Sequence, residues 1–185
     1  MVLASRSPQR RAILERVGVA FTVRPADVEE LVAGDPAGVA VDNALRKARA
    51  ASAASASELV LGVDTLVALD GAIYGKPADE AHARRTLAAL SGAMHTVYSG
   101  IALVGAGGER TAVVATEVVF RELDGGLIDW YVATGEWRER AGGYAIQGAG
   151  AALVREVRGD YENVVGLPLA TLLDLCPELL GACAA

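Results

Sequence analysis

Asp64 is the residue whose placement is hardest to explain by folding alone. It follows the apolar run LVLGV and precedes Thr65 and a second apolar run, LVAL. We expect two core strands here, with Asp64 at a strand end or bulge close to the core. An unpaired carboxylate in such a place costs several kcal/mol even after relaxation, so Asp64 needs a partner. It could shape a turn, bind a metal ion, or take a proton from an attacking water.

Other charged residues in the sequence suit phosphate or metal chemistry, although each also has an ordinary explanation. Lys76 stands in GKP, between a flexible and a rigid residue, and could reach a phosphate as a point charge or remain a solvated loop lysine. Lys47, in LRKARA, fits a solvent-facing position on a helix. Glu29 and Glu30, in DVEE, fit surface acids ahead of a loop.

The N-terminal stretch LASRSPQRRAIL places two cations at an unusual position. Ser7 and Pro8 are typical of the N-cap and first residue of a helix, and Gly18 is typical of its end. Arg10 and Arg11 then fall in the first turn, where the helix dipole makes a cation unfavourable by about 0.3–1 kcal/mol. A pair of arginines at this end requires an explanation.

A glutamine near the C-terminal end completes the polar residues of interest. Gln147 lies between an apolar pair and the glycines of GAG, where a rigidly held amide could pair with the carbonyl and imide N–H of a base, or simply belong to a loop. Asp160 and Asn163 precede VVGLP, and we expect them to shape a turn. His82 and His95 are isolated, and we assign neither a ligand role.

The elements that must position these residues alternate along the chain with short connections. Val2–Ala4 and Ala20–Val23 suit short strands, and Asp70–Gly71 is a strong turn signal. VYSGIALV and RTAVVATEVVF suit a hairpin across 105–108, and AALVREV suits a strand. Helices are predicted over 7–17, 37–55, 79–92, 127–134 and from Pro168 onward. This mixture predicts a three-layer α/β or α+β protein with a mixed sheet in one domain.

Composition excludes several classes of function. The chain has 185 residues, 52% of them hydrophobic and 5% aromatic, with a formal net charge of −6. This charge argues against broad attraction to nucleic acid or acidic membranes, and bases would find few aromatic platforms. Cys176 and Cys183 give no disulfide framework or metal spacing, so we expect reduced thiols. No apolar run reaches the ~20 residues of a membrane helix, and no targeting segment is evident, which favours the cytoplasm.

Five blocks in order resemble the Maf family of nucleoside triphosphate pyrophosphatases: LASRSPQRRAIL, DVEE, LRKARA, GVDTLVALDGAIYGKPADEAHARRTLAALSGAMHTVYSGIAL, and AGGYAIQGAGAALVREVRGDYENVVGLPL. The resemblance spans 1–185 as a single domain. It implies an α/β fold in which an elongated mixed sheet and flanking helices form two lobes around a central cleft. It also implies hydrolysis of a nucleoside triphosphate to the monophosphate and diphosphate, with Mg²⁺ or Mn²⁺. Members are typically cytoplasmic, often homodimeric, regarded as house-cleaning enzymes, and linked to inhibition of septum formation.

The resemblance also implies roles for individual residues. Asp64 corresponds to the proton acceptor, and together with Glu30 we expect it to bind the metal ion. The phosphate-binding and catalytic positions fall on Ser5, Ser7, Arg10, Glu30, Lys47 and Lys76. Base choice falls on Gln9, Thr65 and Gln147, where the dTTP/UTP branch has arginine, threonine and glutamine. Two of these three match and Gln9 departs, whereas none matches the tryptophan, glutamine and glutamate of the 7-methyl-GTP branch.

These roles explain the arginine pair. Backbone N–H groups at the helix start, the Ser5 and Ser7 hydroxyls and the Arg10 guanidinium would surround a triphosphate, while Arg11, about 100° away on the helix, would face solvent. Water activated by Asp64 could attack the α- or the β-phosphorus, with the same products. Three alternatives stay open from the sequence: a phosphatase acting on phosphate esters, a nucleotide-sensing regulator of division without turnover, and a nucleic-acid-binding module.

Overall fold

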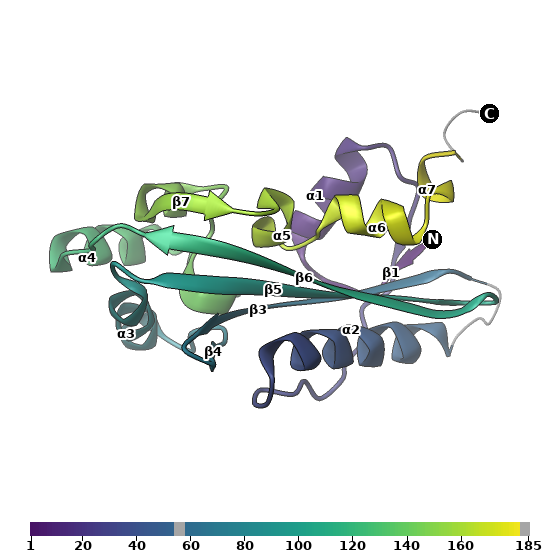
Figure 1. Ribbon diagram of the computed structural model, residues 1–185, viewed down its shortest axis with the longest axis horizontal. Coiled ribbons are helices and arrows are strands. Elements are labelled where there is room, and N and C mark those ends of the chain that lie inside the picture. Colours follow the sequence, from purple (N-terminus) through teal and green to yellow (C-terminus); the bar gives the residue numbers. More distant parts are fainter. Residues whose placement is uncertain (54–57, 182–185) are drawn as a thin grey trace.

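A twisted, elongated sheet runs the length of the molecule (Figure 1). The computed structural model describes residues 1–53 and 58–181, and within them the sheet has seven strands in the order β2-β1-β3-β5-β6-β7, with β4 paired to the far part of β3. β1 pairs in parallel with β2 and β3, and the other pairs are antiparallel. The strands are β1 (Val2–Leu3), β2 (Thr22–Val23), β3 (Val60–Leu69), β4 (Ala72–Tyr74), β5 (Met94–Gly105), β6 (Gly108–Phe120) and β7 (Val154–Arg158). The predicted mixed sheet is confirmed.

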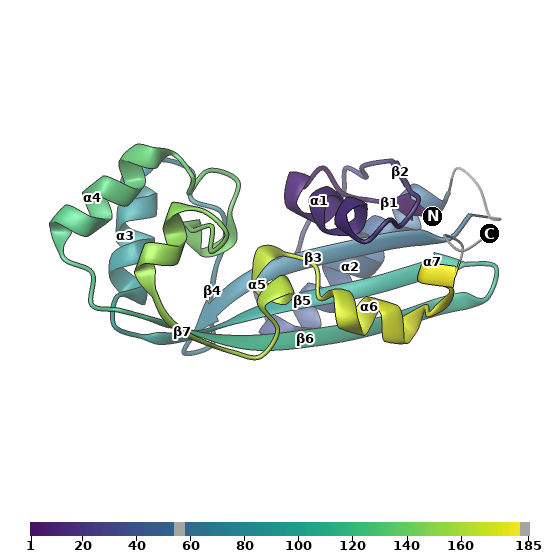
Figure 2. The ribbon, with the colours of Figure 1, turned by 90° about the horizontal axis from the view of Figure 1, so that it is seen from above.

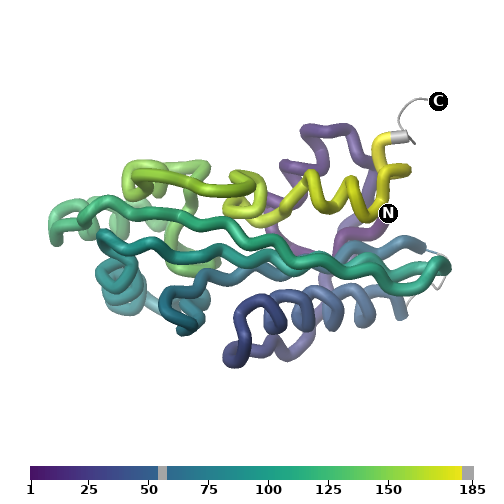
Figure 3. Tube along the Cα trace, in the orientation of Figure 1, coloured from purple at the N-terminus to yellow at the C-terminus, as the bar shows by residue number. Residues whose placement is uncertain are grey.

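Helices cover both faces of this sheet. α2 lies along one face, and the N-terminal α1 shares the other face with the C-terminal α5 and α6 (Figure 3). The helices are α1 (Pro8–Arg16), α2 (Pro36–Ser52), α3 (Glu80–Leu90), α4 (Gly125–Thr134), α5 (Tyr161–Val165), α6 (Leu169–Leu175), α7 (Glu178–Gly181) and the short 3₁₀ turns η1 (Ala141–Gly143) and η2 (Ala149–Leu153). Within the described part of the chain, none of the helices has both the length and the apolar character needed to cross a bilayer. Cys176, after α6, is a buried free thiol, and Cys183 lies outside the described residues.

The elements gather into two lobes (Figure 2), each with buried hydrophobic clusters of its own. In the first lobe, α1 and α6 pack on β1, β3 and β5 through a cluster that includes Leu14, Ile101 and Leu172, and α2 covers the opposite face. In the second lobe, α3, α4 and the η1–η2 segment pack on the far ends of β3, β5 and β6 through a cluster that includes Leu87 and Tyr131. The long strands connect the two lobes, as the predicted two-lobed fold requires.

Local signals placed most helix starts correctly. Ser7 accepts a hydrogen bond from the Arg10 N–H with Pro8 in the first turn, and Asp79 caps α3 in the same way. Asp70 and Gly71 both have positive φ, at 51° and 79°, which is the geometry of a tight hairpin turn between β3 and β4.

Two strand predictions were wrong. The two apolar runs around Asp64 form one continuous ten-residue strand, β3, and Asp64 pairs regularly with Gly100 rather than lying at an end or bulge. The strand continues because Asp64 finds hydrogen-bond partners on the sheet face, so no break is needed to reach water. AALVREV is the 3₁₀ turn η2 through Leu153 and becomes strand β7 only from Val154.

The contact between α2 and the sheet is unusually close. A Cβ atom built on Gly62 would lie 2.1 Å from the Ala44 carbonyl oxygen, and one on Gly100 would lie 2.2 Å from the Ala40 carbonyl oxygen. Only glycine permits this approach of helix backbone to strand. It brings the helix face that carries Asn43 onto the same sheet face as Asp64.

We expect His95 to make stability depend on pH. It is 1% exposed, and burial lowers its pKa from 6.5 to about 4. Below pH 6.5 His95 binds a proton in the unfolded chain but stays neutral in the folded protein. The free energy of unfolding therefore falls as pH falls towards 4. This contribution is about 2 kcal/mol between pH 7 and pH 5. Urea unfolding at the two pH values should show a smaller loss in His95→Asn than in the wild type, and an equal loss would contradict the assignment.

Candidate active site

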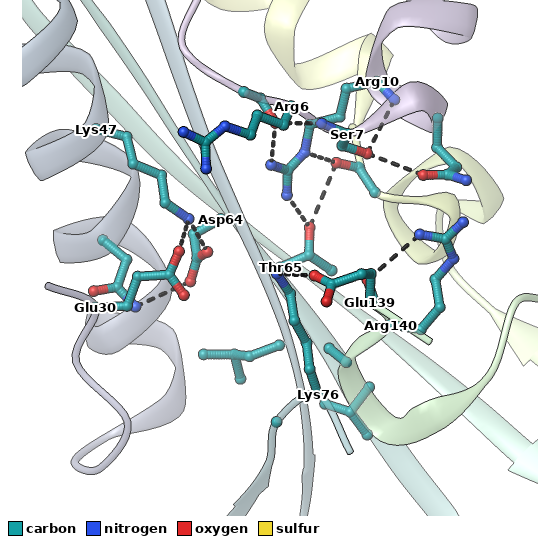
Figure 4. A pocket seen from close by; sticks show the side chains of 18 of the residues that line it. Arg6, Ser7, Arg10, Glu30, Lys47, Asp64, Thr65, Lys76, Glu139 and Arg140 are labelled. Atoms are coloured by element: carbon teal, nitrogen blue, oxygen red, sulfur yellow. Dashed lines mark hydrogen bonds and ion pairs between the residues drawn. The ribbon is translucent and has the colours of Figure 1, made fainter. Parts of the chain in front are cut away.

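A cavity opens where one edge of β3 has no neighbour. β1 pairs with β3 as far as Leu61 and β4 pairs from Val67, so within the described residues no strand covers this edge over 62–66. The cavity has a volume of about 790 Å³ and is lined by residues of both lobes (Figure 4). Asp64 and Thr65 of β3 line its middle. Because neighbouring strand residues point to opposite faces, each meets a different set of partners.

On one face, both oxygens of the Asp64 carboxylate are held. Lys47 Nζ lies 2.5 Å from Oδ1, and the Asn43 amide donates to Oδ2 at 3.0 Å. Lys47 also lies 2.6 Å from Glu30 Oε1 and thus joins the two acids. Asp64 is 8% exposed, so the predicted need for a partner is met by one cation and one amide.

Asn43 was missed by sequence reasoning. It lies four residues before Lys47 on α2, so the two side chains share one helix face, and this spacing was the available signal. Its amide also accepts from the Leu31 N–H at 2.7 Å and donates to the Leu31 carbonyl at 3.0 Å. Asn43 therefore fixes the loop that carries Glu30 relative to Asp64.

The charge state of Glu30 reflects its cationic surroundings. Its partial burial disfavours the carboxylate, but the hydrogen bond and charge of Lys47, together with the charges of Lys76 and Arg10, outweigh burial and lower the pKa of Glu30. Glu30 thus stays ionised next to Lys47.

On the opposite face, Arg10 meets Thr65. Its guanidinium donates to Thr65 Oγ1 at 3.1 Å, to Ser5 Oγ at 2.9 Å and to the Gly166 carbonyl at 2.9 Å. Arg10 is 9% exposed; burial lowers its pKa, and the charges of Asp64 and Glu30 oppose that shift. These three acceptors fix the orientation of the guanidinium. Because all three are neutral, none of them is a counter-ion for it.

A buried polar chain fixes Thr65 in turn. Thr65 Oγ1 lies 2.8 Å from Ser99 Oγ, and Ser99 donates to the Asn163 carbonyl at 3.4 Å. The Asn163 amide donates to Thr116 Oγ1 at 2.9 Å. Ser99 and Asn163 were not assigned to the site from sequence, and Asn163 is a fully buried member of this chain rather than only a turn residue.

The start of α1 faces the cavity as predicted. Ser7 donates from its hydroxyl to Gln9 Oε1 at 3.1 Å, and both residues line the cavity. Arg11 is exposed and lies 3.9 Å from Glu15, so it points away, as the 100° rotation requires.

The second lobe contributes two cations. Lys76 lines the cavity and pairs with Glu139 at 3.2 Å, and Arg140, which sequence reasoning did not single out, lines it beside them. Gly142 has a φ of 67°, and a Cβ there would lie 2.8 Å from Val67, so glycine allows this segment to pack on β3.

Nine of the ten predicted site residues line the cavity: Ser5, Ser7, Gln9, Arg10, Glu30, Lys47, Asp64, Thr65 and Lys76. The tenth, Gln147, is exposed between η1 and η2 and is not among the lining residues. The structure therefore does not bring Gln147 to the other predicted base-contacting residues.

The donor set at Glu30 and Asp64 suits a hard cation shared with a ligand. In the described residues no group of three or more His, Cys, Asp and Glu side chains forms a cage of its own. The two carboxylates nevertheless converge on one point, at Lys47 Nζ. Mg²⁺ is commonly held by one or two carboxylates plus substrate phosphates, so the residues fit such an ion.

Comparison of the sequence with known proteins finds a matching family. The family model for Maf-like protein matches residues 1–179. The chain is 51% identical to a dTTP/UTP pyrophosphatase of Anaeromyxobacter dehalogenans, over 92% of this chain and 89% of the relative. It is 49% identical to a dTTP/UTP pyrophosphatase of Moorella thermoacetica, over 95% and 92%. A solved structure of the Staphylococcus aureus Ham1 protein is similar over 64% of this chain and 70% of that chain, with 20% identity and a TM-score of 0.48.

Proposed function

This chain belongs to the family of Maf-like proteins, and from that premise we propose that it hydrolyses nucleoside triphosphates, dTTP and UTP among them, to the monophosphate and diphosphate. The observation that carries the proposal is that both faces of β3 contribute to one cavity. On one face Thr65 meets the buried Arg10, and on the other Asp64 binds Lys47. The arginine can bind a polyphosphate, and the aspartate can accept the proton of an attacking water.

The chain's own residues account for binding of the phosphates. The start of α1 offers main-chain N–H groups, and Ser5 and Ser7 offer hydroxyls beside the Arg10 guanidinium. Lys76, at the other side of the cavity, exchanges its exposed pairing with Glu139 for a phosphate oxygen. These cations stabilise the negative charge that develops on the leaving group, which is the diphosphate for attack at the α-phosphorus and the monophosphate for attack at the β-phosphorus.

Asp64 acts as the proton acceptor. Lys47 and Asn43 hold its carboxylate at a fixed angle to the cavity, so a water beside it meets an oriented base. Attack at the α- or the β-phosphorus gives the same products.

We propose that a divalent cation, Mg²⁺ or Mn²⁺, is held by Asp64 and Glu30 together with substrate phosphates. Such an ion supplies charge stabilisation and lowers the pKa of a bound water.

The cellular setting is proposed from the family alone. A house-cleaning role in the cytoplasm and a homodimer both fit the family. Light scattering of the purified protein tests the dimer.

Base selectivity rests on Gln9 and Thr65 in our proposal, with Gln147 as a predicted contributor outside the cavity. The Gln9 carbonyl oxygen accepts from Ser7, which leaves the amide N–H groups for a base carbonyl. The Thr65 hydroxyl contacts Arg10 and Ser99, so Thr65 also positions the arginine.

We expect Thr65→Val to raise KM more than it lowers kcat. Valine keeps the shape but removes the oxygen that accepts from Arg10, which leaves a buried donor without its partner at a cost of about 1–3 kcal/mol. Steady-state kinetics with UTP should show a KM increase of about tenfold, because the misplaced cation binds the substrate less well. Thr65→Ser, which keeps the hydroxyl, is the control, and similar KM values for the two variants would exclude this role.

The proposed function is tested by a panel of nucleoside triphosphates with Mg²⁺, Mn²⁺ or a chelator, scored separately for diphosphate and orthophosphate. Diphosphate release with UTP or dTTP supports it. Orthophosphate alone would identify a phosphatase, and tight binding without any product would identify a nucleotide sensor.

A further inference from the structure

Arg140 is a cation of the cavity wall whose pairing differs from that of its neighbours. Three other cations there are paired: Arg6 with Asp27, Lys47 with Glu30 and Asp64, and Lys76 with Glu139. Arg140 forms no ion pair among the residues that the structure describes. Its one side-chain hydrogen bond, from Nη1 to the Glu139 carbonyl, is long at 3.4 Å. Its Nε is buried and has no acceptor within the described ranges.

A buried guanidinium nitrogen without a protein acceptor is costly, and an anionic ligand in the cavity would supply that acceptor. Arg10, on the first lobe, is the other cavity cation held only by neutral oxygens. Two cations that form no ion pair with any described residue thus face one cavity from different lobes (Figure 4). A polyanion that spans the cavity would neutralise both.

The position of Arg140 is fixed by its main chain. Its N–H donates to the Trp137 carbonyl at 3.3 Å, and its carbonyl accepts from the Gly143 N–H at 3.0 Å. The next glycine, Gly142, donates to the Gly75 carbonyl at 3.1 Å, one residue from Lys76. The guanidinium is therefore presented from an anchored segment beside Lys76, unlike an arginine on a free loop.

We propose that Arg140 is a substrate-binding residue of the second lobe and donates hydrogen bonds to the polyphosphate, which it holds across the cavity from Arg10. The identity of the substrate rests on the proposed function, but the phosphate contact does not require turnover. A fork of N–H donors matches phosphate oxygens, and this geometry distinguishes arginine from lysine there.

The test uses inorganic tripolyphosphate, a polyanion without a base, and calorimetric titration in chelator-containing buffer. Arg140→Met should weaken its binding by about tenfold to a hundredfold. The matched control is Arg138→Met, which removes the same charge two residues away; Arg138 is exposed, lies over the Trp137 ring and does not line the cavity. That control should bind tripolyphosphate within about twofold of the wild type.

Equal affinities of the two variants for tripolyphosphate, or no binding of tripolyphosphate by the wild type, would overturn the inference. A loss for UTP without a loss for tripolyphosphate would also overturn it, because Arg140 would then contact the nucleoside. Thermal unfolding checks the fold, and if Arg140→Met fails to fold, Arg140→Lys against Arg138→Lys makes the same comparison. If Arg140→Met weakened tripolyphosphate binding but the wild type hydrolysed no nucleotide, the proposed function would be contradicted and this inference would be supported.

Discussion

Asp64→Asn will lower kcat for nucleoside triphosphate hydrolysis by a factor of about 10²–10⁴ while nucleotide binding persists. The amide cannot accept the proton of the attacking water, but Arg10, Ser5 and the start of α1 remain in place on the other face of β3. Turnover measured by diphosphate release, and affinity measured by calorimetry, separate the two effects. The sign of the affinity change is informative too, because removing one carboxylate from the cavity lowers its repulsion of phosphate.

The same substitution has a structural cost that must be separated from catalysis. Asn43 donates to Asp64 Oδ2 and Lys47 donates to Oδ1. An asparagine at 64 has an NH₂ group in place of one of these oxygens, so either Asn43 or Lys47 would face a donor and lose its acceptor. We expect a loss of about 1–3 kcal/mol in the free energy of unfolding, which leaves the protein folded at room temperature. Asp27→Asn is the matched control, since Asp27 also lines the cavity but pairs with Arg6 at an exposed position. Turnover of Asp64→Asn equal to that of Asp27→Asn would remove Asp64 from the role of base.

Sequence alone predicted the parts of this site whose signals are local. Ser7 and Pro8 mark the start of α1 because capping and a fixed φ act within one turn. The resemblance carried Arg10, Lys47, Lys76 and Asp64 to one cavity, where the structure places all four. Composition contributed the exclusions and nothing about the site itself.

What the sequence could not predict depends on contacts between distant segments. We expected Asp64 at a break in the strand because its partners, Asn43 and Lys47, come from a distant helix. The sequence of β3 does not reveal how closely that helix packs on the sheet. Arg140 was overlooked for the same reason, since only the packing of η1 on β3 turns it towards the cavity. Gln147 is the opposite case: the motif names it, but the structure leaves it exposed between η1 and η2 and outside the lining of the cavity, so its role stays a prediction.

That distance between helix and sheet leads to the second large expected effect, for Gly100→Ala. The new Cβ would lie 2.2 Å from the Ala40 carbonyl oxygen and 2.3 Å from its carbon, and both are backbone atoms that cannot rotate away. Either α2 moves off the sheet or the strand bends, and overpacking of this kind costs about 1–3 kcal/mol or more. Urea unfolding should therefore show a lower free energy of unfolding than in the wild type.

The displacement should also reach the chemistry, because α2 carries both groups that hold Asp64. The Lys47–Asp64 and Asn43–Asp64 contacts, at 2.5 and 3.0 Å, cannot both survive a shift of the helix by an ångström. We expect kcat to fall at least about tenfold, at temperatures where the variant is folded, with KM changed less because Arg10 lies on the other face of the sheet. Gly107→Ala is the control, since a Cβ there meets no atom within 4 Å. If Gly100→Ala matched that control in kcat, α2 would not set the geometry of Asp64, and the base would have to be oriented by β3 alone.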